Sequence, residues 1–248
     1  MHRSVVKVMA LDPTVILNYW PLLVDGALLT LRLAAIAFVG GMLLGAVCAT
    51  LSLLNYWPVR IVILVYLALM RGIPFIVIVF LIHFGLPSFG IRTQALVTGT
   101  VALTLYAGAY YAEIIRAAVL ALPRGQWESA RVIGMPPIAA ARHVIIPQII
   151  SPSVPPIVNC TMTMIKESSI LSAITVAELT YQGLVIQGNT FAPFEVFISL
   201  ALIYWAITIA FSLLAWAYER RFGTASGRTS RMSPIAARYL DIEGKSGR

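Results

Sequence analysis

Three ionisable residues of this sequence lie deep inside apolar runs, where a charge is costly. Arg71 lies within the run 61–85, and Lys166 and Glu167 lie within the run 149–175. A lone charge at the centre of a membrane-spanning helix costs at least about 2.5–3.5 kcal/mol, so each group should face either a cavity or a partner of opposite charge. These residues are therefore the first candidates for a chemical role.

The residues alone leave two interpretations open. In the first, Arg71 and the run Lys166-Glu167-Ser168-Ser169 line a polar path through the membrane. In the second, they form structural ion pairs that hold helices together. Gly72 and Pro74, close behind Arg71, can loosen a helix where a polar lining is needed, which is compatible with the first interpretation.

We find no constellation of catalytic or metal-binding residues. The three histidines are too scattered to suggest a metal site; they are His2, His83 and His143. Gly244-Lys245-Ser246 is similar to the end of a phosphate-binding P-loop, but Tyr239 stands where the first glycine is needed and no strand precedes it. The two cysteines, Cys48 and Cys160, lie in apolar stretches and are interpreted as core residues. We expect no cofactor or metal, and no ATP binding by this chain itself.

The longest polar interruption runs from residue 113 to residue 148, and its local signals predict two short helices joined at a glycine. It carries four arginines, which are Arg116, Arg124, Arg131 and Arg142. Pro123 suits the first turn of the first helix because its missing N–H has no helical partner there. Glu128 could pair with Arg124 and Arg131, although each such pair contributes only about 0.2–0.5 kcal/mol.

The joining residue is Gly134, at the position where a helix C-terminus favours a residue that tolerates a positive φ. Pro136 and Pro137 can begin the second helix, and Pro147 should end it because a proline inside a helix removes a hydrogen bond. One face of that helix carries a row of residues spaced as a docking ridge would be; they are Ile138, Ala141, Arg142 and Ile145.

This stretch resembles the cytoplasmic EAA loop of ATP-binding-cassette (ABC) importer permeases. Glu128-Ser129-Ala130, three residues, Gly134, nine residues and Val144-Ile145-Ile146-Pro147 follow the spacing of that family's Glu-Ala-Ala, Gly and Ile-x-Leu-Pro pattern, with Ser129 in place of the first alanine. The flanking blocks at 109–116, 125–126 and 147–148 are similar to the polar amino acid branch of the family.

Two blocks inside the apolar runs extend the resemblance, which covers about residues 26–221. Met70-Arg71-Gly72-Ile73-Pro74 resembles the family's second-span block, with Ile73 where a threonine is usual. The run that begins at Lys166 resembles Lys-Asp-Thr-Ser-Leu. The resemblance implies that Arg71, Lys166, Glu167, Ser168 and Ser169 line a translocation path, where they meet the ammonium and carboxylate groups of a substrate.

The resemblance also implies a type I importer assembly and the residues that couple to it. Two permeases, identical or paired, would form the pathway, with two ATPase subunits beneath and an extracytoplasmic binding protein above. Coupling to the ATPase would fall to residues of the polar loop, which are Gln126, Glu128, Ser129, Ala130, Gly134, Arg142 and Pro147. The implied location is a bacterial inner membrane, and ATP hydrolysis would be on the partner subunits.

Composition independently indicates an all-α integral membrane protein. Hydrophobic residues make up 59% of the chain and charged residues 11%, against about 25% charged in soluble domains. Run lengths near the roughly 20 residues needed to cross a bilayer predict about five spans. They lie at about 22–54, 61–85, 95–119, 149–175 and 196–217, with a polar segment at 176–195. Gly41 and Gly45 form a GxxxG step that allows close helix approach.

These spans give one permease domain at 22–221, with the coupling loop at about 120–148. It lies between an extracytoplasmic segment, 1–21, and a basic tail, 222–248, predicted to be disordered. With the arginine-rich loop in the cytoplasm, twelve Lys and Arg residues lie inside and three outside, as the positive-inside rule requires. The N-terminus is then outside and the C-terminus inside. The net charge of +8 reflects this topology, and we expect no nucleic-acid partner.

Two other classes of protein are weighed against the permease interpretation. An ion-coupled secondary transporter or channel would act without an ATPase, but a single five-span unit shows no inverted repeat and has no need of a helical docking loop. A non-transporting membrane scaffold would not need charges at membrane depth.

Overall fold

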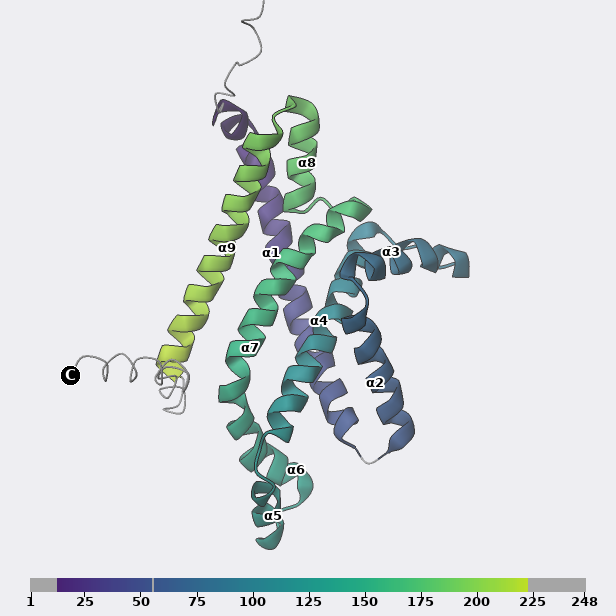
Figure 1. The fold of residues 1–248 in the computed structure, drawn as a ribbon, viewed down its shortest axis with the longest axis vertical. Helices are drawn as coiled ribbons and strands as arrows, with labels where there is room; N and C mark the ends of the chain where they lie inside the picture. Colours follow the sequence, from purple (N-terminus) through teal and green to yellow (C-terminus); the bar gives the residue numbers. More distant parts are fainter. Residues whose placement is uncertain (1–12, 55, 223–248) are drawn as a thin grey trace, which may run out of the picture.

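The computed structural model describes residues 13–54 and 56–222, and every regular element in this part of the chain is a helix. The helices form an elongated bundle (Figure 1). In chain order they are α1 (Pro13–Leu53), α2 (Trp57–Gly72), α3 (Phe75–Gly85), η1 (Leu86–Phe89), α4 (Ala95–Leu120), α5 (Gly125–Val132), α6 (Pro137–Ala140), η2 (Ala141–Ile145), α7 (Ile146–Glu167), η3 (Ser168–Ile174), α8 (Leu179–Thr190) and α9 (Pro193–Phe222). The predicted tail beyond 222 and residues 1–12 lie outside the described residues.

The centre of the bundle is the contact between α1 and α4. A Cβ atom on Gly41 would lie 2.9 Å from the Ala107 Cβ, and one on Gly45 would lie 2.8 Å from the Tyr111 Cβ. Only glycine allows the two backbones to approach this closely. The predicted GxxxG packing is confirmed, and its partner is α4. Around this contact the main core contains Leu33, Ala37, Phe75, Val79, Ala102, Leu103, Ala107, Tyr111, Met164, Leu171, Ile174 and Val176.

The first span is longer than predicted. The helix begins at Pro13 rather than near residue 22, and it passes through Pro21. Ile16 and Tyr19, before the proline, pack against a second core cluster that includes Leu23 and residues of α8 and α9. This packing sustains the helix across the hydrogen bond that a proline removes.

The predicted second span, 61–85, is wrong as one continuous helix. α2 ends at Gly72, and α3 leaves it at an angle of 110°. Ile73, which precedes Pro74, is extended, with φ −103° and ψ 136°. A residue before proline is pushed out of the helical region, and the proline itself cannot donate the next hydrogen bond. The break therefore follows from the sequence, whereas its angle depends on the packing of α3.

Within residues 13–54 and 56–222, four helices are long and apolar enough to cross a membrane, and there are five candidate spans if the bent pair α2–α3 counts as one. The third span, α4, agrees with its predicted bounds. The fourth ends in the 3-10 helix η3, and Thr175 after it has a φ of +64°. The polar segment at 176–195 is largely the helix α8, and the fifth span is α9 from its first residue, Pro193, to Ala217.

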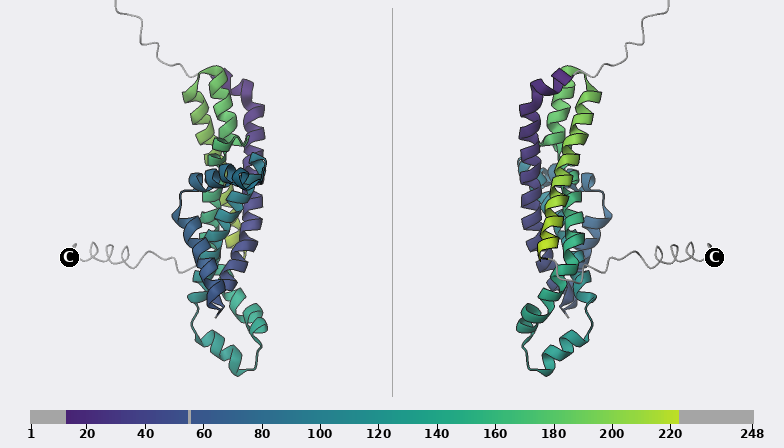
Figure 2. Two further views of the ribbon diagram at one scale, coloured as in Figure 1. Left: turned by 90° about the vertical axis from the view of Figure 1, so that its right-hand side faces the viewer. Right: turned by 90° about the vertical axis from the view of Figure 1, so that its left-hand side faces the viewer.

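The two polar parts of the bundle lie at opposite ends. α5 and α6 project from one end, and α8 packs beside α1 and α9 at the other, as both side views show (Figure 2). α4 leads directly into the projecting end and α7 returns from it. The elements that carry the candidate site are therefore continuous with the central spans.

Candidate coupling loop and charged cluster

The coupling loop, residues 120–148, is built around the predicted glycine turn. Gly134 has a φ of +78°. Its N–H donates to the Arg131 carbonyl at 2.9 Å, and the Met135 N–H donates to the Ala130 carbonyl at 3.0 Å. These two bonds form a Schellman motif with Gly134 at the left-handed position. The predicted helix end is confirmed.

The predicted end of the second helix at Pro147 is wrong. α6 passes through the π-helical turn η2 into α7 without a break, and Pro147 lies in the first turn of α7. The π-helical turn, with hydrogen bonds to the fifth preceding residue, shifts the register of the ladder directly before Pro147, and the helix continues past the residue that cannot donate a bond. The coupling loop is thus rigidly continuous with the fourth span.

Both ends of the coupling loop are tied to each other. The Gln148 Nε2 donates to the Gln126 Oε1 at 2.9 Å and to the Val144 carbonyl at 2.8 Å. Ala130 and Ala140 are buried between the short helices. These contacts join α5 to the start of α7 and hold the two short helices together.

The exposed face of the coupling loop is apolar at its centre and basic around it. Val132, Ile133 and Ile138 are 86%, 74% and 83% exposed on either side of Gly134. Of the predicted ridge, Ile138 and Arg142 are exposed, but Ile145 is only 2% exposed and belongs to the core. An exposed apolar patch with a polar rim is typical of a protein interaction surface. Sequence reasoning missed Val132 and Ile133, which lie in the middle of it.

The charged side chains of the coupling loop form no ion pairs with one another in the described residues. Glu128 and the loop arginines Arg124, Arg131 and Arg142 are exposed, and in the part of the chain that the structure describes, every ion pair involves Glu113. Exposed helix pairs contribute little and cost side-chain entropy. The expected pairs of Glu128 with Arg124 and Arg131 are therefore not formed, and these groups are available to a partner.

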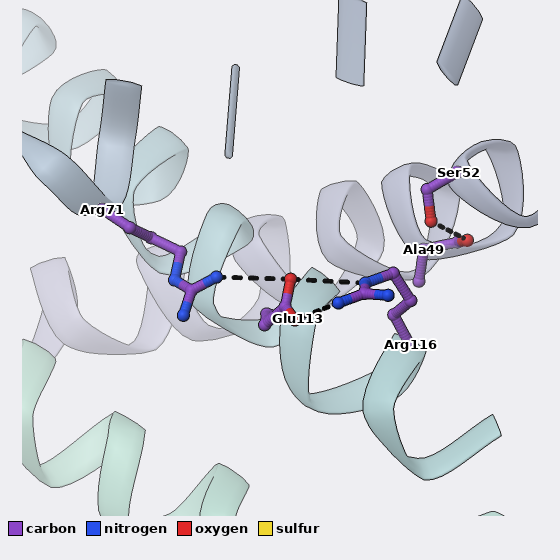
Figure 3. Close-up of polar contacts among 5 residues, drawn as sticks. All are labelled: Ala49, Ser52, Arg71, Glu113 and Arg116. Carbon is purple, nitrogen blue, oxygen red and sulfur yellow. Dashed lines mark hydrogen bonds and ion pairs between the residues drawn. The ribbon is translucent and has the colours of Figure 1, made fainter. Parts of the chain in front are cut away.

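Arg71 belongs to a charged cluster of three residues, Arg71, Glu113 and Arg116 (Figure 3). The Arg71 Nη1 lies 3.3 Å from the Glu113 Oε2. Arg116, one turn further along α4, donates from its Nε to the same oxygen at 3.3 Å and from its Nη2 to the Oε1. The two guanidinium groups approach the carboxylate from opposite sides. Arg71 also lies over the Tyr110 ring, 5.7 Å from its centre.

Within one chain, the geometry supports the interpretation of Arg71 as part of a structural ion pair. Arg71 joins two helices through an ion pair, but the pairing groups are Arg71 and Glu113 rather than Lys166 and Glu167. Sequence reasoning placed Glu113 at the end of a span and did not connect it with Arg71, because the two residues are 42 positions apart. The remaining exposure of the Arg71 side chain, 42%, leaves it open to a further ligand.

The second candidate group lies where α7 passes into η3. Lys166 is exposed, Glu167 and Ser169 are half-buried, and Ser168 is fully buried. The Ser168 Oγ donates to the Ile165 carbonyl at 2.7 Å, so its hydroxyl is directed into its own helix. In the single chain, Arg71 and Lys166 are more exposed than residues at membrane depth were expected to be.

One buried carboxylate was not anticipated. Glu178 is fully buried at the start of α8, outside the candidate spans. It accepts hydrogen bonds from the Thr180 and Tyr181 N–H groups and from the Tyr204 hydroxyl of α9, all at 2.9 Å. Burial raises the pKa of Glu178 above its ordinary value. The residue caps α8 and joins it to α9, a role that a lone Glu before a helical pattern could have suggested.

A large apolar cavity lies away from these polar groups. It has a volume of about 990 Å³ and is lined by α1, α7, the end of α9 and the coupling loop. Trp127 and Ile138 line it on the loop side, and Phe211 and Leu214 on the α9 side. Its lining offers no charged group, so it does not match a path for polar solutes.

The fold and the coupling loop together define a class of protein. A polytopic helical bundle that carries a helical loop with an exposed apolar and basic face at one end has the architecture expected of a membrane subunit that docks on a partner. The resemblance of the loop to the EAA pattern agrees with this class.

Comparison with known proteins identifies the family. The chain belongs to the binding-protein-dependent transport system inner membrane components, whose family model matches residues 41–224. It is 34% identical to the probable glutamine ABC transporter permease protein GlnM of Bacillus subtilis (strain 168), over 85% of this chain and 98% of that protein. It is 36% identical to the L-cystine transport system permease protein TcyB of the same organism, over 82% and 88% of the two chains.

Solved structures show the same fold. A chain of an amino acid ABC transporter crystallised with histidines superposes with a TM-score of 0.81 at 39% identity, over 86% of this chain and all of that one. A chain of the MetNI methionine ABC transporter in an inward-facing conformation gives a TM-score of 0.65 at 22% identity, over 81% and 97% of the two chains, and supports the fold alone. The predicted fold class and the prediction of an ABC importer permease are confirmed.

Proposed function

We propose that this chain is the permease subunit of an ATP-driven importer of polar amino acids or closely related compounds. The observation that carries the proposal is the coupling loop, whose exposed face around Gly134 is built for docking and whose two ends are continuous with α4 and α7. The relatives, which include a probable glutamine permease and a cystine permease, support an amino acid as substrate. The chain itself supplies the route and the coupling, and ATP hydrolysis is carried out by partner subunits.

The coupling loop acts as a lever. Its apolar centre, with Val132, Ile133 and Ile138, sits in a groove of the ATPase, and exposed Glu128 and Arg142 contact the rim. Ala130 and the Gln126–Gln148 bond keep the loop rigid, and Pro147 fixes the start of α7. Nucleotide-driven closure of the ATPase then moves α4 and α7 together, and the spans change between inward-open and outward-open arrangements.

The translocation path passes the polar groups that face away from the α1–α4 core. Arg71 has one side of its guanidinium occupied by Glu113 and the other side accessible, which suits the carboxylate of an amino acid. Glu167, with Lys166 and Ser169 nearby, suits the ammonium group. Ser168 contributes to the shape of this site through its helix rather than through its hydroxyl in this conformation.

The assembly contains two permeases, two ATPase subunits and an extracytoplasmic binding protein. Only 11% of the α9 span and 17% of the fourth span are buried within one chain, against 56% of α4. Such open apolar faces leave room for a second permease, identical or paralogous, as well as for lipid. The N-terminus lies on the extracytoplasmic side of the membrane, and the coupling loop and the C-terminus lie in the cytoplasm.

The proposal is tested by reconstitution. The permease is purified with its partner ATPase, placed in vesicles with ATP on the ATPase side, and given its binding protein loaded with single amino acids. Uptake should require ATP, the ATPase and the loaded binding protein together. Uptake driven by an ion gradient in vesicles that lack the ATPase would overturn the proposal in favour of a secondary transporter.

A further inference from the structure

One face of α4 contacts both helices that flank the bend between α2 and α3. This face carries Tyr106, Tyr110 and Glu113. These residues are spaced four and three positions apart, so they form a continuous row along one side of the helix. Before the bend, Arg71 contacts Tyr110 and Glu113. After the bend, the Phe75 ring lies 4.7 Å from the Tyr106 ring.

The row is itself connected. The hydroxyl groups of Tyr106 and Tyr110 are 3.2 Å apart, and the rings are 5.0 Å apart. Both arms of the bent helix pair are therefore held by one helix within two turns. The Phe75 contact is apolar and part of the core, whereas the Arg71 contact is the directional one, because its ion pair fixes both a distance and an orientation.

Glu113 is placed to pass movement between the coupling loop and the bend. It lies two turns before the end of α4 at Leu120, and the coupling loop follows directly. On the other side, α3 packs against η3, which carries Ser168 and Ser169. A displacement of the end of α4 thus reaches α2 through Glu113 and reaches η3 through α3.

We propose that Glu113 is a positioning residue that fastens the bend at residues 73–74 to α4, so that movement of the coupling loop is transmitted to the elements that line the path. Arg116 holds the Glu113 carboxylate in place from the same helix, and Arg71 is the cross-helix contact. This inference rests on the proposed function, because it assumes that an ATPase moves the coupling loop.

The matched variants follow from the geometry of the cluster. Glu113→Gln removes the carboxylate that joins the two helices. Arg116→Gln removes a charge from the same carboxylate but leaves the contact of Arg71 with Glu113 intact. Arg71→Met combined with Glu113→Gln removes the cross-helix contact and also the unpaired Arg71 charge, while the methionine keeps part of the apolar packing of the arginine stem.

The experiment measures ATP hydrolysis, uptake, KM for the loaded binding protein and copurification of the ATPase with the intact complex. We expect Glu113→Gln to lower the stimulation of ATP hydrolysis by the loaded binding protein by roughly tenfold, within the about 5–150-fold range of coupling between sites. KM should stay near that of the wild type. Arg116→Gln loosens the carboxylate but keeps the cross-helix contact, so it should lower the stimulation less than Glu113→Gln does. The double variant should copurify normally and remain uncoupled.

Two results would overturn the inference. Normal stimulation in Glu113→Gln would mean that the contact transmits nothing. Recovery of binding-protein-stimulated ATP hydrolysis in the double variant would mean that Glu113 only balances the charge of Arg71. Uptake is not the readout for this variant, because Arg71 itself is proposed to meet the substrate. If the wild-type complex itself shows no stimulation by any loaded binding protein, the proposed function fails instead, so the two failures are distinguishable.

Discussion

Gly134 is the single residue of the coupling loop at which the backbone conformation itself favours glycine. Its φ is +78°, and a Cβ atom built on it would meet nothing within 4 Å. A larger residue is therefore disfavoured by backbone strain and not by crowding. A backbone misfit of this kind costs about 1–3 kcal/mol, which is small for the whole bundle but large for the angle between two short helices.

We predict that Gly134→Val leaves the permease inserted in the membrane and strongly reduces uptake, because α5 and α6 no longer present one docking face. The measurement is substrate-stimulated ATP hydrolysis by the reconstituted complex. Gly125→Val is the matched control: Gly125 also has open space around it, but it has no positive φ. Equal stimulation in wild type and Gly134→Val would show that this turn is not part of the coupling element.

At the scale of residues, the sequence predicted what depends on local chemistry. The φ of Gly134 could be predicted because a helix end and its glycine are neighbours in the chain. The pairing of Glu113 with Arg71 could not, because it depends on how α2 is laid against α4. The pairs expected for Glu128 were not formed because they compete with solvation at an exposed site.

At the scale of elements, the close contact between α1 and α4 depends on glycines, which have no side chain to keep the two helices apart. A Cβ on Gly45 would lie 2.8 Å from the Tyr111 Cβ, 2.9 Å from the Ala112 nitrogen and 3.0 Å from the Gly108 oxygen. Two of these atoms are backbone and cannot move aside.

We therefore predict that Gly45→Ala lowers the thermal stability of the permease, by a free energy of about 1–3 kcal/mol as is usual for overpacking. Gly188→Ala is the same change in α8, where a Cβ would meet nothing within 4 Å. It should be neutral or stabilising by up to about 1 kcal/mol through helix propensity. Melting of the purified permease in detergent measures both, and equal melting temperatures would contradict the assigned packing.

A second prediction at this scale concerns the attachment of α8. Glu178→Ala leaves two backbone N–H groups without their acceptor, which costs about 1–3 kcal/mol for each buried group left unpaired. The Tyr204 hydroxyl loses the same acceptor but keeps the Thr180 hydroxyl as a partner at 3.0 Å. Glu178→Gln keeps one acceptor oxygen, and because burial raises the pKa of Glu178, loss of the charge itself costs little. Its stability should be intermediate.

Limited proteolysis of the α8 region and thermal melting report this attachment. Glu195→Ala, a carboxylate in the first turn of α9, is the control and should change stability by no more than about 1 kcal/mol. A Glu178→Ala variant as stable as the control would show that α8 is held by its apolar contacts alone.

Some helix boundaries are set by the local sequence, and others are set by packing against distant parts of the chain. The break after Gly72 is local, since Ile73 precedes a proline, yet the 110° angle reflects the packing of Phe75 and Val79 into the core. The expected stop at Pro147 was wrong because a π-helical turn directly before it shifts the hydrogen-bond register and the helix continues. α1 continued through Pro21 because its first turns pack on α8 and α9.

For the molecule as a whole, the two ends of the bundle differ in charge as well as in shape. Arg116 lies near the end of α4, and Arg124, Arg131 and Arg142 lie between α4 and α7. Arg60 lies in the first turn of α2, which starts at that same end of the bundle (Figure 1). Arg92 lies in the connection between η1 and α4, at the far end of α4. The positive-inside rule then assigns the coupling loop to the cytoplasm.

This orientation is the last prediction. Ser88 is an exposed residue of η1, beyond the bend, and Thr229 belongs to the basic tail outside the described residues. In intact cells a membrane-impermeant thiol reagent should modify Ser88→Cys and spare Thr229→Cys, in a background where Cys48 and Cys160 are replaced. After the membrane is permeabilised, Thr229→Cys should react as well, which shows that its protection came from the membrane. If Thr229→Cys reacts in intact cells and Ser88→Cys does not, the bundle is inverted, and the coupling loop cannot meet a cytoplasmic ATPase.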